Sequence, residues 1–120
     1  MIPLHPTGLH YLAGPYRGAV RANIRRAEEW SAACARRGIY YICPHMNSAF
    51  MGDCAAEDFW LTMDEHIVVK CECVLLMPGW ETSHGTQDEK ALADRLAIPV
   101  WLIEDYLEAW DVQAQTIAPA

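Results

Sequence analysis

The chain has 120 residues, enough for one hydrophobic core and too few for two, so we expect a single domain. Its composition, 52% hydrophobic and 21% charged, is that of an ordinary folded protein and excludes an intrinsically disordered chain. The formal net charge of -7 would repel a polyphosphate backbone over most of the surface, so a nucleic acid polymer is excluded as the expected partner.

The sequence lacks the signals of export, membrane insertion and metal binding. The N-terminal stretch MIPLHPTGLHYLAGPYRG has no basic segment followed by a long apolar one, and no window approaches the roughly 18 apolar residues of a membrane span. We therefore expect a cytoplasmic protein with no membrane partner. The five cysteines lack the spacing of a disulfide framework, and no Cys-x-x-Cys or His-x-x-x-His pair occurs. We expect reduced thiols, no metal site and no cofactor.

The N-terminal third predicts a strand, a helix and a second strand. Residues 9–14 (LHYLAG) form an apolar run that ends at a Gly-Pro turn, which indicates a first buried strand. Over residues 19–37 the apolar side chains recur at helical spacing, and Gly38 follows where a helix C-terminal cap belongs. Residues 39–43 (IYYIC) are β-branched and aromatic and stop at Pro44, which is typical of a second strand.

The rest of the chain continues this alternation after a break. Residues 44–57 are rich in turn-forming and small residues and predict a long loop, which in a compact domain is often functional. The later run CVLLMP is continuously apolar, as in a strand covered on both faces of a sheet. The remaining expected elements are a helix over 57–70, the strand over 73–78, a helix over 86–97 and a strand over 98–103.

Alternating strands and helices are typical of an open, mostly parallel α/β sheet with right-handed crossovers. We expect a three-layer, flavodoxin-like or Rossmann-like fold of four or five strands, in the order of about 2-1-3-4, with helices on both faces. We assign residues 1–110 to this single domain and residues 111–120 to a flexible tail. Ligands of such sheets bind beyond the carboxyl ends of the strands, so we expect the site at the loops 13–18 and 44–50 and the stretch 79–93.

Two acids interrupt apolar helix faces. Glu89 shares a stripe with Leu92 and Leu96, at i, i+3 and i+7, so we expect it to point inward over the end of the sheet. Asp64 lies in a similar apolar stripe of the helix over 57–70. A carboxylate on an apolar face is costly unless it is paired or neutralised, and neither helix needs one to fold. Glu89 and Asp64 are therefore candidate functional residues.

Structural roles also explain several of these polar residues. The stretch TQDE, residues 86–89, fits the capping box, so its glutamate either caps the helix or does chemistry. The stretch SHG, residues 83–85, is a candidate anion-binding turn, because free amides and the helix dipole favour a phosphate there. His45, His66 and His84 are each more often surface or hydrogen-bonded residues, although His45 and His84 lie on loops that face the expected site.

Four stretches resemble the nucleoside 2-deoxyribosyltransferase superfamily. They are YLAGPYRG at the first strand, PHMNSAF after the second, the Asp of WLTMDEHI, and LLMPGWETSHGTQDEKALADRLAIPVW. The resemblance extends over about residues 11–103 and points to the small phage and bacterial branches of uncharacterised domains, with nucleotide N-glycosidases as near relatives. Its most specific element is Ser-x-Gly-x-x-x-Glu-x-x-x-Ala, formed here by Ser83, Gly85, Glu89 and Ala93.

This resemblance implies a role for each matching residue. Glu89 corresponds to the nucleophile that attacks the anomeric carbon of a ribose or deoxyribose, Tyr11 to the tyrosine that orients it, and Asp64 to the acid near the departing base. Ser83 and Gly85 occupy positions that hold a 5′-phosphate in the branch that cleaves nucleoside monophosphates. The other residues that we expect to bind substrate are Gly14, Tyr16, Arg17, His45, Trp80 and His84.

The implied activity is cleavage of the N-glycosidic bond of a nucleoside 5′-monophosphate or a (deoxy)nucleoside through an intermediate on Glu89. Water would release the sugar in a hydrolase, and a second base would do so in a transferase. We expect the helix dipole to keep Glu89 ionised in the first turn, and Asp64 to be partly protonated on its apolar face. Relatives complete each site from a neighbouring subunit, so we also expect a homodimer or higher homo-oligomer.

Two other classes of function stay open. One is a binding or sensor protein of the same fold, which holds a nucleotide without cleaving it. The other is an NAD-cleaving glycohydrolase, which needs room for the second nucleotide. A Rossmann reductase is disfavoured, because AGPYRGAV lacks Gly-x-Gly-x-x-Gly.

Overall fold

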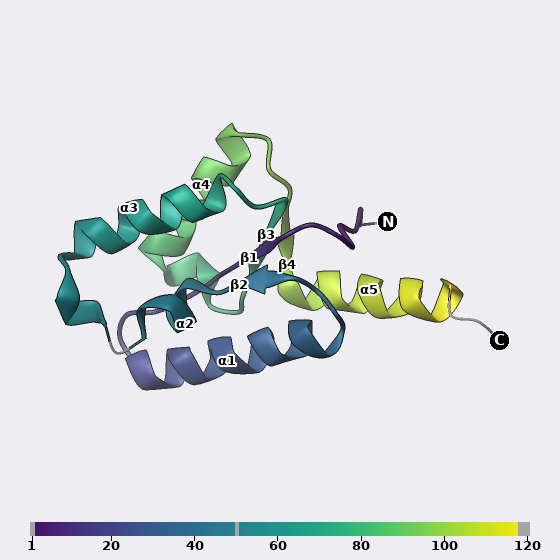
Figure 1. Ribbon diagram of the computed structural model, residues 1–120, viewed down its shortest axis with the longest axis horizontal. Coiled ribbons are helices and arrows are strands. Elements are labelled where there is room, and N and C mark those ends of the chain that lie inside the picture. Colours follow the sequence, from purple (N-terminus) through teal and green to yellow (C-terminus); the bar gives the residue numbers. More distant parts are fainter. Residues whose placement is uncertain (1, 50, 118–120) are drawn as a thin grey trace.

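The computed structural model describes residues 2–49 and 51–117 of the chain (Figure 1). Its elements in chain order are β1 (His10–Ala13), α1 (Val20–Arg36), β2 (Tyr41–Ile42), α2 (Pro44–Ser48), η1 (Gly52–Cys54), α3 (Glu57–Val68), β3 (Cys73–Leu76), η2 (Trp80–Thr82), α4 (His84–Arg95), β4 (Val100–Leu102) and α5 (Ile103–Ile117). Here η marks a single 3₁₀ turn.

The described strands form one parallel sheet in the order β2-β1-β3-β4, as the alternation of the sequence predicts. β1 is central: Tyr11 lies opposite Ile42 of β2 on one side and Val74 of β3 on the other. Because all four strands run the same way, the segments that follow β1, β2 and β3 gather at one end of the sheet.

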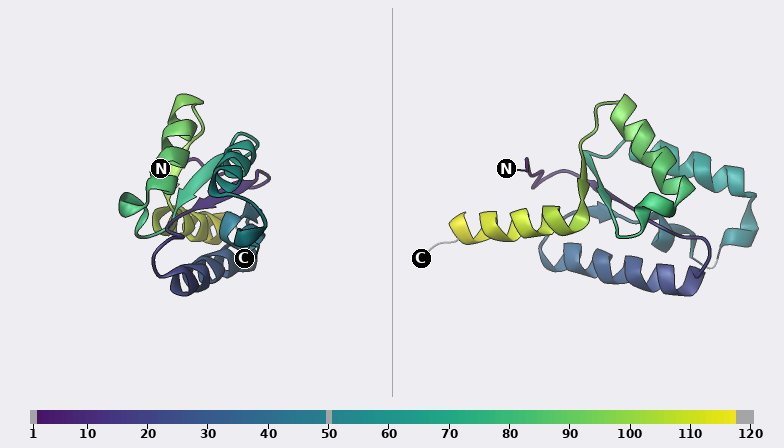
Figure 2. Two further views of the ribbon diagram at one scale, coloured as in Figure 1. Left: turned by 90° about the vertical axis from the view of Figure 1, so that its left-hand side faces the viewer. Right: turned by 180° about the vertical axis from the view of Figure 1, so that it is seen from behind.

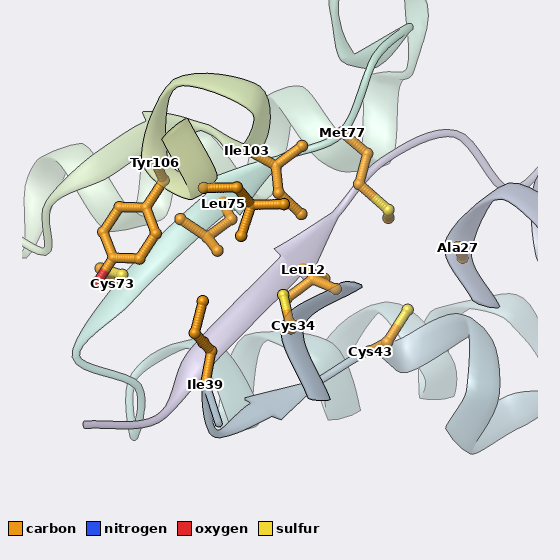
Figure 3. Packing of buried hydrophobic residues seen from close by; sticks show 11 residues of the cluster. Leu12, Ala27, Cys34, Ile39, Cys43, Cys73, Leu75, Met77, Ile103 and Tyr106 are labelled. Carbon is orange, nitrogen blue, oxygen red and sulfur yellow. The ribbon is translucent and has the colours of Figure 1, made fainter. Parts of the chain in front are cut away.

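Helices cover both faces of the sheet, which gives the expected three layers (Figure 2). Leu12 points into a cluster with side chains of α1, β3 and α5, including Cys34, Leu75 and Ile103 (Figure 3). Its neighbours Tyr11 and Ala13 point to the opposite face, into a cluster with residues of α3 and α4. Burial on both faces explains why the strands are apolar runs rather than alternating ones.

The expected loop over residues 44–57 is partly helical. α2 begins at Pro44, whose missing N–H is no loss at the first position of a helix. η1 follows over Gly52–Cys54, and the Trp60 indole N–H of α3 donates to the carbonyl of Gly52 at 3.2 Å. Short helical turns in this segment therefore hold backbone groups that a longer open loop would leave to solvent.

The C-terminal segment differs most from expectation. A tail was expected over residues 111–120, but α5 continues through Ile117, and residues 118–120 lie outside the described residues. Tyr106 and Leu107 are buried near the start of α5. Further along the helix, Asp111 forms a bidentate ion pair with Arg37, at 2.8 and 2.9 Å. The apolar residues 103, 106, 107 and 110 do follow helical spacing, so the pattern was present in the sequence.

No helix within residues 2–49 and 51–117 is long and apolar enough to cross a bilayer.

Candidate functional site

Tyr11 and Glu89 are in direct contact in the layer formed by α3 and α4. Tyr11 is completely buried on β1, and its hydroxyl donates a hydrogen bond to Oε2 of Glu89 on α4. The contact joins two residues far apart in the sequence, and it lies beside the sheet rather than beyond its end, since Tyr11 is the second residue of β1. Glu89 is therefore turned toward Tyr11, but the predicted stripe is not the buried one. Leu92 is only partly buried and Leu96 is 50% exposed, whereas Thr86 and Ala93 are the buried residues of α4.

The start of α4 shows that the predicted capping box is wrong. Ser83 is the N-cap: its Oγ accepts hydrogen bonds from the Thr86 amide at 3.3 Å and from the Thr86 hydroxyl at 2.9 Å. Thr86 is thus inside the helix and is itself buried. Glu89 is therefore in the second turn of α4, where it cannot cap the helix and its carboxyl group can bind Tyr11.

Both carboxyl groups have raised pKa values. Burial raises the pKa of Glu89 to about 8; the hydrogen bond from Tyr11 opposes this shift, and nearby acids, Asp64 first, add to it. Burial on α3 likewise raises the pKa of Asp64 to about 6. Tyr11 has a pKa well above its usual value, because it is buried and then because both acids lie close. The three side chains thus form one electrostatic group.

This order of pKa values is the reverse of the expected one, in which Glu89 was ionised and Asp64 protonated. The reason is the register of α4: the helix dipole acts mainly on the first turn, and no acid lies there. In the second turn Glu89 loses most of its water without that compensation.

His45 is enclosed rather than open to a ligand. Only 4% of it is exposed; its Nε2–H donates to the Pro15 carbonyl at 2.7 Å, and its Nδ1 lies 3.8 Å from Sγ of Cys43. Burial lowers its pKa, which favours the neutral ring. The partly buried Tyr16 ring stands edge-on to the imidazole, with ring centroids 5.4 Å apart. Of the two, Tyr16 is the better placed to touch a ligand.

Gly14 and Arg17 flank this pair along the chain. A Cβ at Gly14 would lie 2.9 Å from Cβ of Met77, so a glycine is required where the end of β1 passes the residue after β3. Arg17 is exposed and forms an ion pair with Glu57 at the start of α3. The ion pair connects the loop after β1 to the helix that carries Asp64.

The other predicted residues gather around the start of α4. Ser83 already satisfies the Thr86 amide, so the candidate anion-binding turn retains the amides of His84 and Gly85. His84 is exposed, and Gly85 is partly buried, with 4.0 Å between a Cβ built there and Cδ2 of Leu61.

Trp80 packs against the cluster that contains Tyr11, and it also lines a groove of about 480 Å³ at the free edge of the sheet. Besides Trp80, the groove is lined by Leu76, Lys90, Asp94, Ala97, Ile98, Pro99, Val100, Trp101 and Leu102. Asp64 is partly buried, but it does not line this groove, and neither do Tyr11 and Glu89. Within the described ranges, no three His, Cys, Asp or Glu side chains are placed to hold a metal ion.

Two site residues were missed by the sequence reasoning. Asn23 is only 7% exposed on the buried stripe of α1, and its side chain binds the loop after β1. It breaks an apolar helix face just as Asp64 does, so the same criterion would have found it. Cys43 is buried in the cluster around Leu12, and its Sγ lies beside Nδ1 of His45, a position that became apparent only from the fold.

Fold and site together define a three-layer α/β protein with a buried tyrosine and carboxyl pair beside the central strand. The chain belongs to a domain family of unknown function (DUF7768), whose sequence model matches residues 9–103. The match covers all four strands and ends where α5 begins. No curated protein matches the chain.

Proposed function

We propose that this protein cleaves the N-glycosidic bond of a nucleoside 5′-monophosphate or a (deoxy)nucleoside, with Glu89, Asp64 and Tyr11 as its catalytic residues. The observation that carries the proposal is the hydrogen bond from the buried Tyr11 hydroxyl to Glu89, with Asp64 in the same electrostatic group. Cleavage of a glycosidic bond needs two carboxyl groups in different environments, and this pair meets that requirement.

The reaction has two steps. A carboxylate oxygen of Glu89 forms a bond to the anomeric carbon, the bond from that carbon to the base nitrogen breaks, and Asp64 gives its proton to the departing base. Water then attacks the same carbon, the bond to Glu89 breaks, and Asp64 takes the proton from the water. A second base in place of water makes the enzyme a transferase.

Between the two carboxyl pKa values, about 6 and about 8, the pair carries one proton, and the higher pKa places it mainly on Glu89. The reaction uses the minor form, in which that proton is on Asp64 and Glu89 is ionised, so we expect the rate to be greatest in this pH window. The Tyr11 hydroxyl increases the population of this form, because its hydrogen bond to Glu89 opposes the effect of burial.

A panel of nucleosides, nucleoside monophosphates and NAD, assayed for free base by chromatography, tests the proposal. Wild type should release base from at least one compound, and E89Q should lose at least about 10³-fold of that rate. E29Q is the control, because Glu29 is an exposed acid of α1 on the other face of the sheet. A covalent sugar adduct on the peptide that contains Glu89, trapped with a slowly hydrolysed 2-fluoro nucleoside, would identify the nucleophile.

A nucleotide-binding protein without activity is the second candidate, and the raised pKa of Glu89 favours it. A carboxyl group with a pKa of about 8 is mostly protonated at pH 7 and is then no nucleophile. In that case wild type releases no base from any compound, and E89A keeps the ligand-dependent rise in melting temperature. Release of base from NAD alone would assign the chain to the glycohydrolases.

We also propose a cytoplasmic location and a homo-oligomer. All five cysteines are free thiols, as expected in a reducing compartment. Light scattering at several protein concentrations measures the oligomeric state, and a monomer at every concentration contradicts the homo-oligomer.

A further inference from the structure

Three consecutive carbonyl groups in the loop after β1 are held by side chains. The Pro15 carbonyl accepts from His45, and the Tyr16 and Arg17 carbonyls both accept from the Asn23 amide, at 3.1 and 2.9 Å. Loops at ligand sites are usually mobile and solvated. Here buried groups of α1 and α2 fix the backbone from two sides.

Asn23 is fully engaged. Its amide nitrogen has two hydrogens and donates to two carbonyls, and its Oδ1 accepts from Nη2 of Arg26 at 2.9 Å. The Arg26 contact distinguishes the two ends of the amide, because a guanidinium can only donate. Nothing in the helix requires a polar residue at this buried position, so the side chain serves the loop.

His45 fixes the other side of the loop as a neutral ring. Because the Pro15 carbonyl can only accept, Nε2 carries the hydrogen and Nδ1 is the bare nitrogen that faces the thiol of Cys43. The ring also supports Tyr16 edge-on. One imidazole thus sets both the backbone of the loop and the side chain that projects from it.

The loop is connected to the carboxyl pair through two elements. It follows β1, which carries Tyr11. Arg17 of the loop forms an ion pair with Glu57 at the start of α3, the helix that carries Asp64. The shape of the loop and the position of the catalytic side chains therefore depend on the same strand and helix.

We propose that Asn23 and His45 are positioning residues for substrate, which hold the loop over Pro15, Tyr16 and Arg17 in its binding shape. The proposal rests on the proposed function and deepens it: the loop is one wall of the nucleotide site, with the Tyr16 ring and the Arg17 guanidinium as the groups that touch the ligand.

Paired variants test each residue. H45Q keeps a donor near the position of Nε2, whereas H45L removes it. N23S removes both bonds to the loop carbonyls, and N23D in addition places a carboxylate against them. R26A is the matched control, because it removes the partner of Oδ1 and leaves the bonds to the loop in place.

Two measurements are made on each variant. Hydrogen exchange of the amides of residues 16–18 should become at least about 10-fold faster in H45L and N23S, while the amides of β3 stay protected and show that the fold is intact. In steady-state kinetics KM should rise by about 10-fold or more, with kcat changed by less than about 3-fold. H45Q and R26A should stay close to wild type in both measurements.

The proposal would be overturned if H45L and N23S had the same hydrogen-exchange rates and the same KM as wild type. It would also be overturned if H45Q behaved like H45L. Faster exchange with unchanged KM would show a structural clamp only, and it would overturn the positioning role. If wild type cleaves no compound, the proposed function is wrong, but the positioning role of Asn23 and His45 can still be tested by binding. The rise in melting temperature with adenosine 5′-monophosphate is then measured in place of KM, and H45L and N23S should lose this rise.

Discussion

Replacement of Glu89 by Gln should stabilise the protein relative to wild type as the pH rises, although we expect it to abolish the proposed reaction. Gln keeps the shape of the side chain and still accepts from the Tyr11 hydroxyl. The folded protein holds the Glu89 proton up to a pKa of about 8, whereas the unfolded chain loses it near the ordinary value of 4.5. At pH 7 this difference costs wild type about 3 kcal/mol, at about 1.4 kcal/mol for each pKa unit between 4.5 and 7.

The sign follows from the proton count. Between the two pKa values the folded state binds more protons than the unfolded state, so wild-type stability falls as the pH rises through this window. Urea unfolding at pH 5, 6, 7 and 8 should show E89Q gaining on wild type by about 1.4 kcal/mol for each pH unit. E29Q, at an exposed acid of α1 on the other face of the sheet, should show no such trend. A gap between E89Q and wild type that stays constant from pH 5 to 8 would refute the buried, protonated Glu89.

Three further predictions concern neighbouring features. Y11F removes the donor to Glu89, so the pKa of Glu89 should rise further and the basic limb of the pH profile of base release should move up; an unmoved limb contradicts this. G14A brings a Cβ within 2.9 Å of Met77 and should lower the free energy of unfolding by about 1–3 kcal/mol, whereas G52A, with open space around it, should change it by less than about 0.5 kcal/mol. His10 donates to the Tyr40 carbonyl, accepts from the Tyr106 hydroxyl and has a pKa lowered chiefly by burial. Its unfolded form therefore binds more protons below about pH 6.5, and wild type should lose more stability than H10Q between pH 7.5 and 5.5; equal losses would contradict this role.

The order of the strands followed from the sequence because each strand is a continuous apolar run between turn signals. The contact between Glu89 and Tyr11 is present as the resemblance implied, but the predicted stripe of Glu89, Leu92 and Leu96 was wrong, because Leu96 is 50% exposed and Thr86 and Ala93 form the buried face of α4. The roles of Glu89 and Tyr11 in a reaction stay predictions.

The helix cap and the ionisation of the acids did not follow from the sequence. Ser is a better N-cap than Thr, but the capping-box pattern of residues 86–89 outweighed this preference in the prediction, whereas Ser83 caps the helix. With Ser83 rather than Thr86 as the N-cap, Glu89 lies almost one turn further from the start of the helix. At that distance the helix dipole no longer stabilises its charge. Its ionisation then depends on how much water the fold excludes, and no pattern of neighbouring residues reports that.

The departure of α5 from the sheet has a practical consequence for the experiments. β4 passes into α5 without a loop, and the helix carries the chain away from the end of the sheet where the loops after β1 and β2 lie (Figures 1 and 2). A surface or a fluorophore attached near Gln115, which is exposed, would therefore stand well clear of the carboxyl pair. Immobilisation through α5 should leave the carboxyl pair accessible, which suits this helix as the attachment point for a ligand screen.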